Sequence, residues 1–288
     1  MRELPYLTPS YITTHAAARP ARRIVLGVCV GIASASLSAS LTAQAVTPGL
    51  SAAVASSANE LVAQGDRESV ARRTAAALAL YERAVQADPR HYAALWKAAQ
   101  EAVDLGEFER DGARRSDLYA RATAYARRAV ALGTGDAEGY FHLARALGRT
   151  ALALGPRERV KYAVDVRDQA LAALKLMPRH AGALHVLGVW NAEVMRLNGF
   201  ARAVAKTFMG GQVFNTASWS EAVRYLEQAV AIEPNRLVHH LDLARIYRDV
   251  GRKADARTAY AAALRAPIFD ANDPVYRQSA EDELRALR

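Results

Sequence analysis

Residues 243–263 read LARIYRDVGRKADARTAYAAA, and this stretch decides the fold. Small and aromatic residues recur in it at Leu243, Ala244, Tyr247, Gly251, Ala256, Tyr260 and Ala263. Small side chains let two helices approach closely, and aromatic rings fill the holes that remain between them. Gly251 falls where the chain has to turn from one helix to the next. The pattern predicts a helix pair, which is one unit of a repeat with a period of 34 residues.

The second helix of this unit has counterparts further back in the chain. Its last small residue recurs at Ala84, Ala129, Ala173, Ala229 and Ala263. A proline follows five residues after three of these alanines, at Pro89, Pro178 and Pro234. Proline ends a helix because it has no N–H to donate. The alanines are 45, 44, 56 and 34 residues apart, so the earlier units contain longer helices or inserts.

The composition agrees with a chain of helices. Hydrophobic residues make up 51% of the 288 residues, but aromatic residues make up only 7%. Many of the other hydrophobic residues are alanine, the strongest helix former. No long alternation of β-branched and polar residues is present, which excludes a β-sandwich or barrel. The predicted fold class is all-α. It is an α-solenoid of about five helix pairs with a C-terminal capping helix that opens at Asp273-Pro274.

The cysteine content and the charge limit the kinds of covalent link, metal site and partner that we expect. The single cysteine, Cys29, rules out an intrachain disulfide framework and a cysteine-based zinc site. The formal net charge is +9, but part of this excess lies in residues 1–45, which hold four arginines and one carboxylate. The remainder is a weak argument for nucleic acid, so no nucleic-acid partner is expected.

The N-terminus has the pattern of an export signal. Three arginines precede an apolar run over 24–32, and a stretch of small residues then ends at Ala43-Gln44-Ala45. This order predicts a signal peptide over 1–45, cleaved after Ala45, and a protein located in the periplasm or cell envelope. General secretion is favoured over twin-arginine export, and an uncleaved membrane anchor is the alternative. Residues 46–57 are expected to be a flexible leader, and residues 58–288 the repeat domain.

The irregular repeat resembles a known family of tetratricopeptide proteins, the regulators of microtubule dynamics. Three stretches carry the likeness: the aromatic helix start at 140–144 with the basic helix 157–176 after it, the segment 185–190 after Pro178, and the long connection 201–219. The resemblance implies a non-enzymatic scaffold, and animal members of the family are microtubule-associated or tether organelles. The export signal is a departure from that family.

In such a solenoid the first helix of each pair lines a concave face, which is where partners usually bind. The repeat register places on this face Trp96, Gln100, Phe141, Arg145, Arg149, His185, Val189, Arg245 and Arg248. Aromatic rings supply contact area for an extended chain, and arginines can bind carboxylates through two hydrogen bonds. The predicted partner is therefore a protein or peptide segment of acidic character. The alternative is that the aromatic residues are core and the arginines face solvent.

No motif supports an enzyme. His180-x4-His185 and His239-His240-x-Asp242 are the nearest approach to metal ligands, but adjacent histidines on one helix point about 100° apart, so no metal and no cofactor are expected. No small-molecule substrate is expected either. Three hypotheses stay open: an exported adaptor, a scaffold anchored to a membrane or bound to microtubules, and an enzyme using the 239–242 cluster. The apolar insert 198–219 either covers the groove or packs on its own solenoid.

Overall fold

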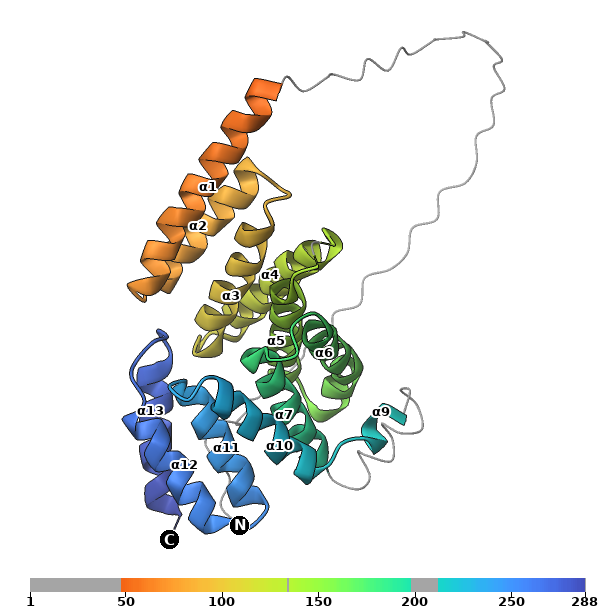
Figure 1. Ribbon diagram of the computed structural model, residues 1–288, viewed down its shortest axis with the longest axis vertical. Helices are drawn as coiled ribbons and strands as arrows, with labels where there is room; N and C mark the ends of the chain where they lie inside the picture. Colours follow the sequence, from red (N-terminus) through yellow and green to blue (C-terminus); the bar gives the residue numbers. More distant parts are fainter. Residues whose placement is uncertain (1–47, 134, 198–211, 288) are drawn as a thin grey trace, which may run out of the picture. The chain divides into compact units, whose positions relative to one another are not determined.

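The computed structural model describes residues 48–133, 135–197 and 212–287, and every regular element in these ranges is an α-helix. In chain order the helices are α1 (Pro48–Val70), α2 (Thr74–Ala87), α3 (Tyr92–Glu107), α4 (Gly112–Ala131), α5 (Ala137–Leu152), α6 (Pro156–Leu176), α7 (Ala181–Arg196), α9 (Gln212–Asn215), α10 (Trp219–Ile232), α11 (Leu237–Asp249), α12 (Lys253–Arg265) and α13 (Asp273–Ala286) (Figure 1). The expected signal peptide, with its cleavage residues Ala43 and Ala45, lies outside these ranges, as do residues 198–211 of the insert.

The helices pack as successive pairs along the chain. The pairs are α1 with α2, α3 with α4, α5 with α6, α7 with α10, and α11 with α12, and α13 packs on the last of them. The first helices of neighbouring pairs also touch, as α3 does with α5 and α5 with α7. This confirms the predicted all-α solenoid of five helix pairs with a C-terminal capping helix.

The alanines that mark the repeat are buried positions in the second helix of each pair. Ala84, Ala129, Ala173, Ala229 and Ala263 are each 0–1% exposed. A methyl group is the largest side chain that these close contacts admit. The prolines lie just beyond the same helices: α6, for example, ends at Leu176, two residues before Pro178.

Residues 46–57 were expected to be a flexible leader, but the described part of this segment is helical. Helix α1 begins at Pro48, so residues 48–57 are its first turns. Proline is well tolerated at the first position of a helix, and the serines and glycine of this stretch stand among alanines that favour helix. Residues 48–57 are therefore helical despite their Ser, Pro and Gly content.

The described end of the insert packs on α7. Phe214 of α9 is 2% exposed, and its ring centroid lies 6.4 Å from that of Trp190. Ser218 then caps α10, because its hydroxyl accepts a hydrogen bond from the Glu221 N–H at 3.1 Å. The Ser218 N–H donates to Asn191 Oδ1 at 3.1 Å, which ties the cap to α7 as well.

The chain between α12 and α13 reaches back to the second helix pair. Asn272 Nδ2 donates to the carbonyl oxygen of Asp104 at 3.0 Å, and the Tyr276 ring lies 5.5 Å from that of Phe108 at the end of α3. The C-terminal segment therefore contacts both the last pair and α3. No helix within the described ranges combines the length and the apolar character that crossing a membrane requires.

Candidate functional site

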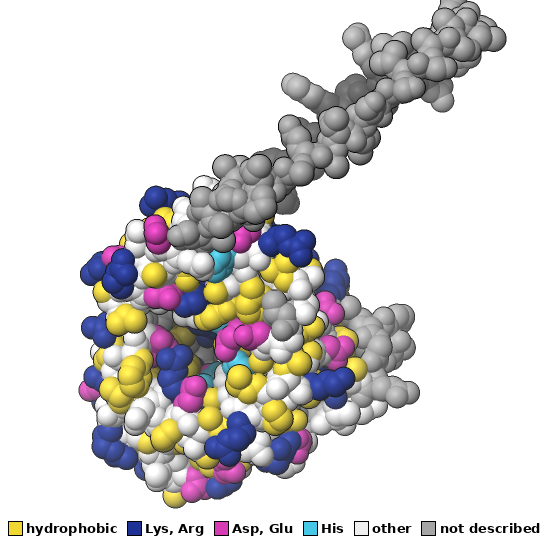
Figure 2. Space-filling view, turned by 45° about the horizontal axis from the view of Figure 1, so that its top comes forward, with side chains coloured by type: hydrophobic (Ala, Val, Ile, Leu, Met, Phe, Trp, Pro, Cys, Tyr) yellow, Lys and Arg dark blue, Asp and Glu magenta, His cyan; other side chains and the backbone are white. Residues whose placement is uncertain are grey.

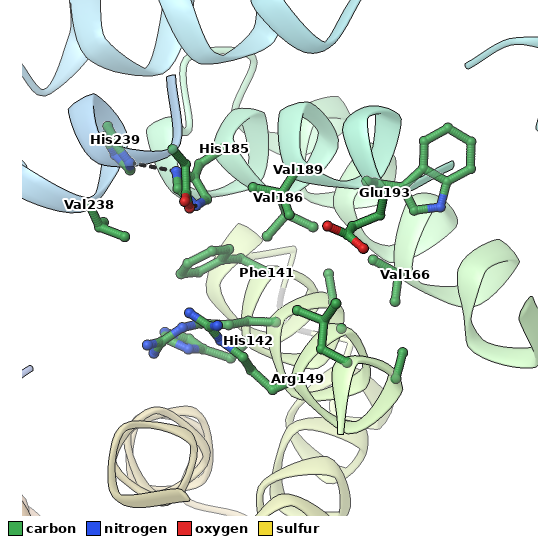
Figure 3. A pocket seen from close by; sticks show the side chains of 18 of the residues that line it. Phe141, His142, Arg149, Val166, His185, Val186, Val189, Glu193, Val238 and His239 are labelled. Atoms are coloured by element: carbon green, nitrogen blue, oxygen red, sulfur yellow. Dashed lines mark hydrogen bonds and ion pairs between the residues drawn. The ribbon is translucent and has the colours of Figure 1, made fainter. Parts of the chain in front are cut away.

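A cavity of about 460 Å³ lies between α3, α5, α6, α7 and α11, beside the segment that leads into α13. Figure 2 shows a hollowed face in which basic, acidic and histidine side chains lie close together. In Figure 3, side chains from α5 face side chains from α7 and α11 across the open space. One part of the wall is apolar, with Val160, Val166, Val186, Val189, Trp190, Val194 and Phe214. The other part is polar and rich in histidine.

Most of the residues predicted for the concave face meet at this cavity. Its lining includes Trp96, Gln100, Phe141, Arg145, Arg149, His185 and Val189. Arg245 and Arg248 are not part of the lining, because both extend to Glu283 of α13, at 2.7 Å and 3.0 Å. The repeat register thus places seven of the nine side chains around one space.

Carboxylates of the same chain neutralise the predicted arginines. Arg145 forms an ion pair with Asp104 of α3, and Arg149 forms one with Glu107. Arg245 has a second partner, Asp242, at 2.9 Å. An acidic partner segment would have to displace these carboxylates from part-buried ion pairs, at the cost of leaving them uncompensated.

A first imidazole cluster joins α5 to α7. Glu138 lies 3.4 Å from the Nε2 atoms of both His142 and His180. Nδ1 of His180 accepts a hydrogen bond from the Ala183 N–H at 3.1 Å, so we assign its proton to Nε2 and the ring is neutral. His142 stacks on Trp96 with ring centroids 5.2 Å apart. Burial lowers the pKa of His142, against the pull of Glu138, so this ring is also neutral near pH 7.

A second cluster joins α7 to α11. Nδ1 of His185 lies 2.9 Å from Nδ1 of His239, and the outer Nε2 atoms lie 3.1 Å from Asp242 and Glu233 respectively. Each Nε2 faces a carboxylate and therefore carries a proton, and the contact between the Nδ1 atoms needs one more. The two rings thus share three protons and one positive charge. Burial lowers the pKa of His239 to about 4.

Sequence reasoning missed Glu138 and His142 as site residues. A signal was available, because each lies three or four residues from the predicted Phe141 or Arg145 and so on the same helix face. The histidines weighed as metal ligands have other roles in the structure: His180 caps α7, and His240 Nε2 lies 2.7 Å from the Pro234 carbonyl oxygen. In the described part of the chain, no three His, Cys, Asp or Glu side chains are grouped so that they could hold a metal ion.

Known proteins resemble this chain both in sequence and in fold. Residues 54–288 match the family described as Regulator of microtubule dynamics protein 1-3. Regulator of microtubule dynamics protein 1 of Mus musculus is 22% identical over 142 residues, which are 49% of this chain and 46% of that protein; the Bos taurus protein is also 22% identical, with 44% of its length covered. The chain thus spans about half the length of the curated relatives it matches. A thermophilic TPR protein of Thermus thermophilus superposes with a TM-score of 0.57 and 23% identity, over 78% of this chain and 98% of that one.

Proposed function

Because the chain belongs to the regulator of microtubule dynamics protein 1-3 family and folds as a tetratricopeptide solenoid, we propose that it is a non-catalytic scaffold that binds a segment of a partner protein. The binding site in this proposal is the cavity between α3, α5, α7 and α11. Recognition is an equilibrium between preformed surfaces, and no covalent step is involved.

The observation that carries the proposal is the cavity itself. Its volume of about 460 Å³ lies within the range of about 300–1,000 Å³ that is typical of binding pockets. Its wall combines an apolar part that can bury side chains with a polar part that can bind backbone or side-chain groups. The first helices of three successive pairs supply most of the lining, which is the surface that solenoid proteins commonly use for binding.

The proposed cellular setting is the periplasm or cell envelope, reached after removal of residues 1–45. It is supported by the order of basic, apolar and small residues that ends at Ala45. N-terminal sequencing of the protein isolated from its native host should begin at Val46. An intact N-terminus would instead support the alternative, an intracellular scaffold that is anchored to a membrane or associated with microtubules.

A random heptapeptide library displayed on phage tests the binding proposal. We expect the full-length protein to enrich a shared sequence pattern, and Val189→Trp to bind the selected peptides at least tenfold more weakly, because the larger side chain fills the cavity. Val275→Trp, at an exposed position of α13, is the matched control and should bind as the wild type does. Circular dichroism and thermal melting establish that both variants fold. The proposal fails if no pattern is enriched or if Val189→Trp retains the same peptides.

A further inference from the structure

The carboxylates that line the cavity differ in whether an arginine lies close enough to neutralise their negative charge. They are Asp104, Glu138, Glu193, Glu233, Asp242 and Asp270. Five of the six have an arginine within 4 Å among the described residues. The exception is Glu138, whose ion-pair contacts in the same residues are the two imidazoles of His142 and His180.

Glu138 keeps its negative charge in this setting. Burial alone would raise the pKa of its carboxyl group, but the two imidazoles of His142 and His180 beside it together lower it. Because both imidazoles are neutral, their Nε2 atoms lie 3.4 Å from the carboxylate without supplying a positive charge. The Glu138 side chain is 30% exposed and lies at the cavity wall, where a bound molecule can reach it.

The neighbouring His142 adds an independent observation. This residue is 3% exposed, and its Nδ1 has no hydrogen-bond partner in the described structure. Because Nε2 faces the Glu138 carboxylate and carries the proton, Nδ1 is a bare acceptor. Leaving a buried acceptor without a donor is unfavourable, and a ligand N–H supplies the missing donor once the ring turns Nδ1 toward the cavity. His142 lines the cavity next to Phe141 (Figure 3).

A negative charge without a cation and an acceptor without a donor therefore lie side by side on the polar wall. We propose that the cavity accepts a cationic group rich in N–H donors, a primary ammonium or a guanidinium, held by Glu138 with its apolar stem against the valine-lined wall. In terms of the proposed function, on which this inference rests, the partner segment presents a lysine or arginine beside apolar residues. This reverses the acidic character expected from the arginines of the concave face.

Three small probes with six carbon atoms each test the inference directly: n-hexylammonium, hexanol and hexanoate. Ligand-observed NMR with the full-length protein measures their affinities at pH 7. We expect hexylammonium to bind at least tenfold more tightly than hexanol, and hexanoate more weakly than either. In Glu138→Gln the ammonium should lose this advantage and bind within about twofold of hexanol. Glu281→Gln, which removes an exposed carboxylate of α13, is the matched control and should leave all three affinities unchanged.

Each outcome decides the inference separately from the proposed function. Equal or tighter binding of hexanoate, an ammonium preference that survives in Glu138→Gln, or no binding of any probe would each overturn it. If hexylammonium binds through Glu138 but the phage library yields no peptide, the cation site stands and the scaffold proposal fails. If peptides are enriched without lysine or arginine, the scaffold proposal stands and the cation site does not serve it.

Discussion

Glu101 of α3 is a carboxyl group almost without contact with water. Its exposed fraction is 3%, and Oε1 accepts a hydrogen bond from the Ser69 hydroxyl at 2.7 Å. Burial raises the pKa of Glu101 to about 7, only partly offset by that hydrogen bond, from an ordinary value of 4.5. Between pH 4.5 and 7 the unfolded chain therefore loses a proton that the folded chain keeps. The free energy of unfolding falls as the pH rises through this window.

Glu101→Gln should remove that pH dependence, since an amide can accept the Ser69 hydrogen bond but does not ionise. At pH 8 we expect the variant to be more stable than the wild type, by on the order of 2 kcal/mol. At pH 4.5 the two should be nearly equal. Urea unfolding at both pH values measures the difference, with Glu281→Gln as the control at an exposed site. A difference that is the same at both pH values would contradict the assignment.

At the scale of single residues, the repeat register predicts which side chains line the cavity but not how they are paired. Trp96, Phe141 and His185 could be placed because each follows its helix signature by a fixed offset. The partner of Arg145 is Asp104, 41 residues earlier, and that of Arg245 is Glu283, 38 residues later. Which carboxylate meets which arginine depends on how neighbouring pairs are stacked, and unequal repeat lengths hide this from the sequence.

At the scale of the helix, two glycines in comparable mid-helix positions differ in what surrounds them. A Cβ on Gly188 of α7 would lie 2.7 Å from Leu226 Cγ and 3.2 Å from the Ala222 carbonyl oxygen, because α7 and α10 meet there. A Cβ on Gly148 of α5 would meet only Val166 Cγ1, at 4.0 Å. The first position needs glycine for close packing, whereas the second does not.

The two alanine substitutions should therefore change stability in opposite directions. Gly188→Ala should lower the free energy of unfolding by about 1–3 kcal/mol, because Leu226 and the backbone of α10 have to move. Gly148→Ala should raise it by about 0.5–1 kcal/mol through better helix propensity. Chemical denaturation of the two variants beside the wild type measures both effects. Stabilisation by Gly188→Ala would show that the α7–α10 contact is looser than the structure has it.

Helix boundaries follow from the sequence where a capping side chain or a proline marks them, and not elsewhere. The basic helix expected over 157–176 appears as α6, Pro156–Leu176, because Pro156 and Pro178 bracket it. The start of α1 was misplaced because alanine among serines gives no sharp signal of where a helix begins. The hydrogen bond from Asn272, which directly precedes α13, to Asp104 of α3 joins residues 168 positions apart, and no repeat pattern predicts it.

At the scale of the whole repeat domain, that contact changes how cooperative unfolding should be. In an open solenoid each repeat touches only its neighbours, so the two ends unfold almost independently. Here Tyr276 of α13 is 9% exposed, with its ring beside Phe108 and its hydroxyl oxygen 3.4 Å from Arg149 Nη2. Arg72, in the turn after α1, donates to the Ile268 carbonyl oxygen at 3.2 Å. The last repeat is thereby linked to the first two.

Tyr276→Ala should break this link and separate the stabilities of the two ends. In the wild type we expect the slowest amides of α3 and of α12 to exchange with the same opening free energy, since both require global unfolding. In Tyr276→Ala they should diverge, with α12 exchanging faster than α3, and total stability should fall by about 3–5 kcal/mol for the lost aromatic side chain. Hydrogen exchange followed by mass spectrometry measures both regions at once. Val275→Ala, the exposed neighbour, should leave them coupled. If α3 and α12 already differ in the wild type, or stay equal in Tyr276→Ala, the C-terminal segment does not join the ends into one cooperative unit.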